Sequence, residues 1–213
     1  MSDEIELRAA WTASVGRDAR CIATFEEVVG RHREPHRRYH GVRHVTWVVR
    51  HVHELATEVP PADLGVVVAA AFYHDAVYDP TAADNEVQSA ALAERVLGEL
   101  GWDTSRSRTV GDLVRATAGH EPDGTADCAV LLDADLAVLG SDPAAYQAYV
   151  TGVRAEYSHL DDQTWTSGRT DVLRRLLERR PLYVTEPGRR RWESRAQANL
   201  AAELATLGLR SGD

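Results

Sequence analysis

Residues 66–75 read Val-Val-Val-Ala-Ala-Ala-Phe-Tyr-His-Asp, a run of small and apolar residues that ends in two polar side chains. The seven residues from Val66 to Phe72 predict a helix that is buried on most of its sides. An ionised aspartate directly after such a helix costs several kcal/mol of desolvation unless it is paired or bound to a metal. We therefore expect His74 and Asp75 to belong to a buried polar site.

The rest of the chain repeats apolar residues at helical spacing and shows no convincing alternation with a period of two. This pattern predicts an all-α fold. The length of 213 residues suits one domain, a helical bundle over residues 1–213 with its core from about 11 to 207. The expected helices cover about 6–30, 44–59, 63–72, 85–100, 104–118, 126–139, 144–160, 170–180 and 189–207.

The composition excludes several function classes. All 24 basic residues are arginines, so Schiff-base chemistry, a P-loop lysine and a serine–lysine dyad are excluded. The formal charge of −9 argues against a nucleic acid as the main ligand. No apolar run approaches the roughly 20 residues that span a bilayer, and residues 1–6 lack the features of a secretory signal. We expect a cytoplasmic protein without a membrane role.

Four short motifs carry candidate metal ligands, because imidazole and carboxylate groups together suit divalent transition ions. A lone histidine is more often a hydrogen-bonded core residue or a surface residue, so each motif is weak alone. At two-residue spacing on a helix, two aspartates cannot point the same way, so in the last motif one would bind metal and the other would support it. The motifs are Tyr39-His40 with His44, His74-Asp75, His120 after Gly119, and Asp133-Ala134-Asp135.

The arrangement resembles the HD superfamily of metal-dependent phosphohydrolases, whose signature is a histidine, a later His-Asp doublet and a distal aspartate. The resemblance extends from about Trp11 to Leu207 and is strongest to a bacterial subgroup of predicted HD phosphohydrolases. It rests on residues 72–79 (FYHDAVYD), 85–90 (NEVQSA), 132–140 (LDADLAVLG), 154–157 (RAEY) and 196–200 (AQANL). It implies an HD-type helical fold.

The same resemblance implies a bound divalent cation, one of Mn, Fe, Co, Ni, Mg or Zn. Its ligands would be His44, His74 and Asp75, with Asp135 preferred to Asp133 as the fourth. The implied activity is hydrolysis, by metal-activated water, of a phosphomonoester that is a nucleotide or a small phosphorylated metabolite. Tyr78 stands where one nucleotidase branch of the superfamily has a glutamate.

Five further residues are candidates for catalysis and substrate binding, and all of them except Asp79 have a simpler alternative. Asp79 and Glu86 could act as the general base, although Glu86 could instead only cap its helix. Arg154 and Arg169 could clamp a phosphate or be solvated charges. His120 could contact phosphate or a second metal, or only interact with a helix dipole.

Two other functions remain open at this point. One is a non-catalytic, metal-containing module that binds a nucleotide or regulates. The other, more distant, is an oxygen-dependent di-metal enzyme, which would need His120 as an additional ligand. The expected partner is a small phosphorylated molecule, and self-association into a homo-oligomer stays open.

Overall fold

The computed structural model describes residues 2–210, and within this range the chain forms helices and no strand, which confirms the all-α prediction. No helix in the described range is long and apolar enough to cross a membrane. The elements are α1 (Ser2–Ser14), α2 (Ala19–Arg31), α3 (Val42–Ala56), α4 (Leu64–Tyr73), α5 (Asn85–Glu99), α6 (Thr104–Gly119), α7 (Ala126–Leu136), η1 (Ala137–Gly140), α8 (Pro143–Glu156), α9 (Asp162–Glu178), α10 (Glu186–Gly188), η2 (Arg189–Glu193) and α11 (Ser194–Arg210).

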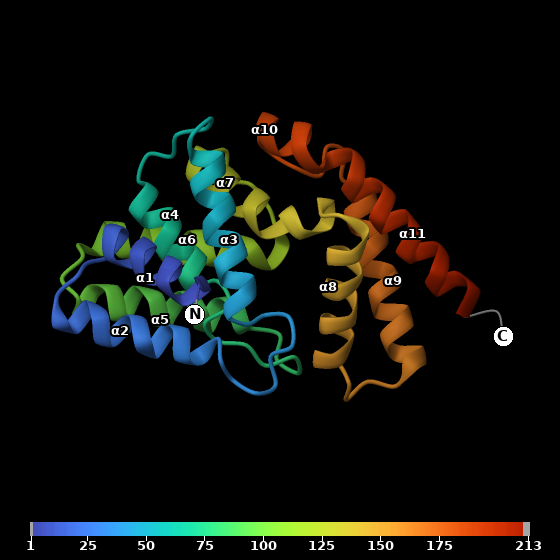
Figure 1. Ribbon diagram of the computed structural model, residues 1–213, viewed down its shortest axis with the longest axis horizontal. Helices are drawn as coiled ribbons and strands as arrows, with labels where there is room; N and C mark the ends of the chain where they lie inside the picture. Colours follow the sequence, from blue (N-terminus) through green and yellow to red (C-terminus); the bar gives the residue numbers. More distant parts are fainter. Residues whose placement is uncertain (1, 211–213) are drawn as a thin grey trace.

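Helix α4 lies at the centre of the core and is surrounded by α1, α3, α6 and α7 (Figure 1). Every residue from Val66 to Tyr73 is buried, as the unbroken apolar run predicts. Asp63 caps the helix by accepting a hydrogen bond from the backbone N–H of Val66. Because α4 contacts both α3 and α7, the residues that follow it are held beside these two helices.

The single helix expected over residues 6–30 is wrong, because the chain breaks there into α1 and α2. Gly16 adopts a φ of 152°, a conformation that side-chain-bearing residues rarely adopt. Asp18 then caps α2 by accepting hydrogen bonds from the backbone N–H groups of Arg20 and Cys21. Apolar periodicity runs through the break, so the local backbone and the cap decide the boundary.

Other boundaries also differ from the expected ones. Helix α9 begins at Asp162 instead of near 170, because Asp161 caps it through the backbone N–H of Thr164. Its first two turns are polar and carry little apolar periodicity. The expected helix over 126–139 ends at Leu136 and continues as the 3-10 turn η1. The last helix is preceded by α10 and the π-helical turn η2.

Helices α8, α9 and α11 lie together at the side of the molecule away from α1 and α2 (Figure 1). One connection of this group to the rest of the molecule is η1, where the side-chain amide of Asn199 donates to the backbone oxygens of Leu139 and Ser141. One cluster of buried apolar residues runs from Leu7 to Leu207. The α8–α9–α11 group therefore forms a wall beside the ends of α4 and α7.

Candidate metal centre

Three elements bring four polar side chains together at the C-terminal end of α4. His44 lies in the first turn of α3, and His74 and Asp75 follow α4 directly. Asp135 lies one residue before the end of α7. Since α4 contacts α3 and α7, the order of these elements in the core places the four side chains at one point.

The possible metal-binding atoms of His44, His74 and Asp75 all lie within 4.8 Å of one another, close enough to share one ion. Nε2 of His44 is 3.0 Å from Nε2 of His74. Oδ2 of Asp75 lies 3.3 Å from the former nitrogen and 3.0 Å from the latter. Oδ1 of Asp135 lies 3.3 Å and 3.6 Å from the same two atoms. The group His44, His74 and Asp75 could therefore hold a metal ion, and Asp135 faces the same point.

Hydrogen bonding orients His74 as a ligand. Its Nδ1 lies 2.9 Å from the carbonyl oxygen of Ala71, which can only accept, so Nδ1 carries the hydrogen. In the neutral imidazole this leaves a lone pair on Nε2, which points at the cluster. A metal-ligating histidine commonly donates its other ring N–H to a carbonyl in this way. The donor set of two imidazoles and two carboxylates fits a divalent transition ion.

The charges of the cluster compensate one another. Although burial disfavours the imidazolium, the carboxylates of Asp75 and Asp135 raise the pKa of His74. Burial likewise opposes the charged form of both aspartates, yet the histidines hold the pKa of each carboxyl well below its usual range. A proton held by the histidines therefore offsets part of this negative charge, and a divalent cation would offset all of it in place of the proton.

The two neighbouring aspartates of α7 have different surroundings. Asp133 is fully buried and points away from the cluster. Its oxygens accept hydrogen bonds of 2.7 and 2.8 Å from the backbone N–H groups of Val184 and Thr185, and one of 2.6 Å from the Thr185 hydroxyl. Asp133 thus anchors the segment before α10, while Asp135 faces the histidines, as the two-residue spacing on a helix requires.

His120 lies on the other side of Asp135. Its Nε2 is 2.9 Å from Oδ2 of Asp135, whose Oδ1 faces His44 and His74. His120 ends α6 in the left-handed conformation, with φ of 51°. Arg179, the residue that follows α9, holds this turn by donating to the backbone oxygens of Gly119 and His120. The two oxygens of Asp135 thus face opposite partners.

The cluster forms the floor of a cavity of about 500 Å³ between the α4–α7 ends and α9. This volume falls in the range of roughly 300–1,000 Å³ that is typical of small-molecule sites. Four carboxylates and two guanidinium groups line it, so without a cation the cavity would repel an anion. These charged residues are Asp75, Glu86, Glu121, Asp135, Arg175 and Arg179.

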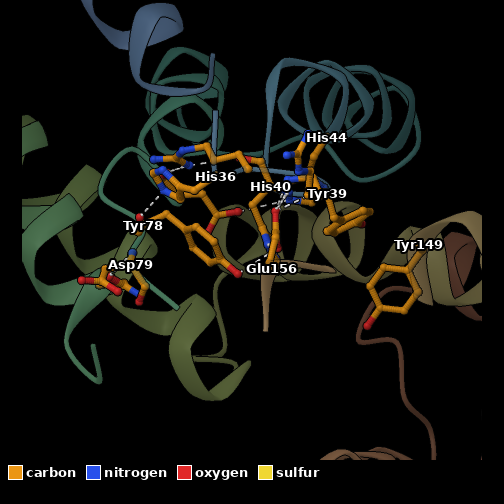
Figure 2. Close-up of polar contacts among 12 residues, drawn as sticks. His36, Tyr39, His40, His44, Tyr78, Asp79, Tyr149 and Glu156 are labelled. Carbon is orange, nitrogen blue, oxygen red and sulfur yellow. Dashed lines mark hydrogen bonds and ion pairs between the residues drawn. The ribbon is translucent and has the colours of Figure 1, made fainter. Parts of the chain in front are cut away.

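Not every residue singled out in the sequence reaches this cavity. Glu86 and His120 line it. Asp79 does not, since its exposed carboxylate accepts hydrogen bonds from the backbone and hydroxyl of Thr81, and Figure 2 shows it apart from His44.

The two arginines expected to clamp phosphate also lie outside the cavity lining. Arg154 donates to the carbonyl oxygens of Tyr157 and Leu160 and so closes the end of α8. Arg169 is buried in an ion pair with Glu203, at 2.7 Å. The structure therefore assigns both arginines to packing of the α8–α9–α11 group, and the cavity takes its guanidinium groups from other positions.

Sequence reasoning missed the role of Glu156, at the end of α8. Its side chain is fully buried, and its Oε1 accepts hydrogen bonds from the backbone N–H groups of residues 38, 39 and 40. Its Oε2 accepts from Nδ1 of His40 at 2.6 Å and from the Tyr78 hydroxyl at 2.9 Å, so the three side chains converge in Figure 2. The RAEY segment was noted in the sequence, but nothing in it identifies the partners of the glutamate.

Comparisons of this chain with models of protein families, with curated proteins and with solved structures found no match.

Proposed function

We propose that this chain is a divalent-metal-dependent phosphohydrolase of the HD type, acting on a phosphomonoester that is a nucleotide or another small phosphorylated metabolite. The observation that carries the proposal is the convergence of two imidazoles and two carboxylates, from His44, His74, Asp75 and Asp135, on the floor of a cavity. A bound divalent cation would lower the pKa of a coordinated water toward roughly 7 and polarise a phosphoryl oxygen.

The charged groups of the cavity favour binding of an anionic substrate only when a cation is also bound. The four carboxylates of the cavity outnumber its two guanidinium groups. A divalent ion on the floor cancels this excess and gives a phosphate a favourable place to bind. Arg175 of α9 and Arg179, which follows this helix, line the wall of the same cavity.

Two side chains of the cavity can hold or move a proton. His40 donates from Nδ1 to Glu156, so in the neutral ring Nε2 carries a lone pair. His40 lines the cavity from the turn just before α3, and we assign its Nε2 to proton exchange with the substrate or its attacking water. Glu86, half-buried at the start of α5, is the second candidate for this role. Asp79, outside the cavity, is not part of this proposal.

The test is phosphate release by metal-stripped protein from nucleotides and sugar phosphates, after addition of Mn, Fe, Co, Ni, Mg or Zn. Asp75→Asn removes one charged ligand with little change in shape. Asp112→Asn is the matched control, because Asp112 is an exposed carboxylate on α6, with 73% of its side chain accessible.

We expect at least one metal to restore turnover in the wild type and in the Asp112→Asn variant but not in Asp75→Asn. Protein that binds metal and folds, yet releases phosphate from no compound, would refute the phosphohydrolase proposal. That outcome would favour the alternative of a metal-containing nucleotide-binding or regulatory module.

A further inference from the structure

One face of α9 forms a wall of the cavity above the metal ligands. Val172, Arg175 and Leu176 of α9 line the cavity at helical spacing, together with Arg179, the residue that follows the helix. The wall therefore presents two apolar side chains and two guanidinium groups to whatever occupies the cavity. Leu136, Val138 and Leu139 of the α7–η1 corner are among the other apolar residues that line the cavity.

The two arginines of this wall differ in what they already bind. Arg179 donates to the carbonyl oxygens of Gly119 and His120 and lies 3.4 Å from a carboxylate oxygen of Glu121. The side chain of Arg175 is exposed and makes no hydrogen bond or ion pair with any residue in the range 2–210. Arg175 thus has its full set of donors available in the cavity.

Arg175 and the metal ligands occupy different depths of the cavity. The histidines of the cluster are almost fully buried, with side-chain accessibilities of 3% for His44 and 2% for His74, whereas Arg175 is an exposed residue. An anion on Arg175, at the exposed edge of the cavity, and a phosphate at the buried ligands can therefore be separate groups of one molecule. The apolar side chains of α9 and of the α7–η1 corner also line the cavity, so they can contact an uncharged part of the ligand.

We propose that Arg175 binds a second phosphate group of the substrate, remote from the phosphate that is hydrolysed, so that the substrate class is organic bisphosphates. This inference rests on the proposed function, because the reacting phosphate is placed at the metal ligands. A guanidinium group suits the role, since it can bind a phosphate through two parallel hydrogen bonds.

Binding measurements can test this inference without turnover. The probes are alkylphosphonates and the α,ω-alkane bisphosphonates of the same chain lengths, whose C–P bonds resist hydrolysis, titrated calorimetrically into metal-loaded protein. Arg175→Ala is the test variant. Arg174→Ala is the matched control, because Arg174 is the neighbour of Arg175 on α9 and does not line the cavity. Its exposed guanidinium lies 3.8 Å from a carboxylate oxygen of Asp171.

We expect one bisphosphonate length to bind the wild type about tenfold tighter than its monophosphonate, as a charge-assisted hydrogen bond would give. Arg175→Ala should reduce this ratio to about twofold or less, and Arg174→Ala should keep it. A wild type without the preference, one that binds neither probe, or an Arg175→Ala variant that keeps the preference would overturn the inference.

The two proposals fail in different ways. An Arg175-dependent preference for bisphosphonates, combined with no phosphate release from any ester, would refute the hydrolase and leave the bisphosphate site standing. Metal-dependent hydrolysis of esters by a protein without that preference would refute the bisphosphate site and leave the hydrolase standing.

Discussion

Nδ1 of His40 donates to Oε2 of Glu156 across 2.6 Å, although 116 residues separate the two in the chain. The carboxylate also accepts hydrogen bonds from three consecutive backbone N–H groups and from the Tyr78 hydroxyl. A buried carboxylate with so many donors is strongly held, so Glu156 determines both the course of the chain before α3 and the orientation of the His40 ring.

The variant Glu156→Gln should lower the free energy of unfolding at pH 7 by about 2–3 kcal/mol, because an amide cannot accept all of these hydrogen bonds. If His40 exchanges a proton with the substrate, the variant should also lose at least about tenfold in kcat while keeping its metal affinity. Urea unfolding, phosphate release and metal titration measure the three quantities. Unchanged unfolding would contradict the role given to the carboxylate.

The stabilisation by Glu156 should depend on pH. Burial alone would raise the pKa of this carboxyl, but the hydrogen bond from His40 and those from the backbone lower it to about 2, from an ordinary value of 4.5. A lowered pKa means that the stabilisation is present above pH 4.5 and is lost as the pH falls toward 2. The difference in unfolding free energy between the wild type and Glu156→Gln should therefore shrink over that interval, and a constant difference would contradict this assignment.

The two aspartates of α7 should respond differently to the same substitution. Asp135→Asn should weaken metal binding at least tenfold with little loss of stability, because Asp135 faces the two histidines. Asp133→Asn should lower the unfolding free energy by about 1–3 kcal/mol and leave metal affinity nearly unchanged, because Asp133 holds the backbone at Val184 and Thr185. Metal titration and urea unfolding of both variants decide this, and a reversed pattern would exchange the two roles.

Metal binding should release protons near neutral pH. The carboxylates of Asp75 and Asp135 overcome the effect of burial and raise the pKa of His74 above its ordinary value of 6.5, so the metal-free site retains a proton. A metal must displace that proton, and the apparent affinity should therefore rise with pH. Calorimetry at pH 7 in buffers of different ionisation enthalpy should give a release of about one proton per ion. Binding without proton release would show that the histidines are already neutral.

Arg169 should matter for stability. Its guanidinium and the carboxylate of Glu203 are 6% and 8% accessible and lie 2.7 Å apart. Arg169→Ala would leave Glu203 charged and buried without its partner, at a cost of about 3–5 kcal/mol. The double variant Arg169→Leu with Glu203→Leu should recover much of this loss in urea unfolding. A single variant as stable as the wild type would show that the ion pair contributes little.

The sequence by itself determined the all-α class of the fold and the presence of a buried polar site at His74 and Asp75. Helical periodicity is a local property, so the all-α class and most helix boundaries follow from the spacing of apolar residues and from caps such as Asp63. A buried charge after an apolar helix is also visible locally, and it directs attention to His74 and Asp75. Where apolar spacing runs through a break, as at Gly16, the same reasoning joins two helices into one.

Only the tertiary structure decided which polar groups meet. Asp133 and Asp135 are alike in sequence, and the packing of α7 against α3 turns Asp135 to the histidines. Glu156 of α8 binds His40, and Arg175 of α9 lines the cavity whereas Arg154 does not. Both results follow from the packing of α8 and α9 beside the end of α4. Such pairings depend on contacts between residues far apart in the chain. The spacing of residues along one helix predicts which residues share a face, but not which other helix that face contacts.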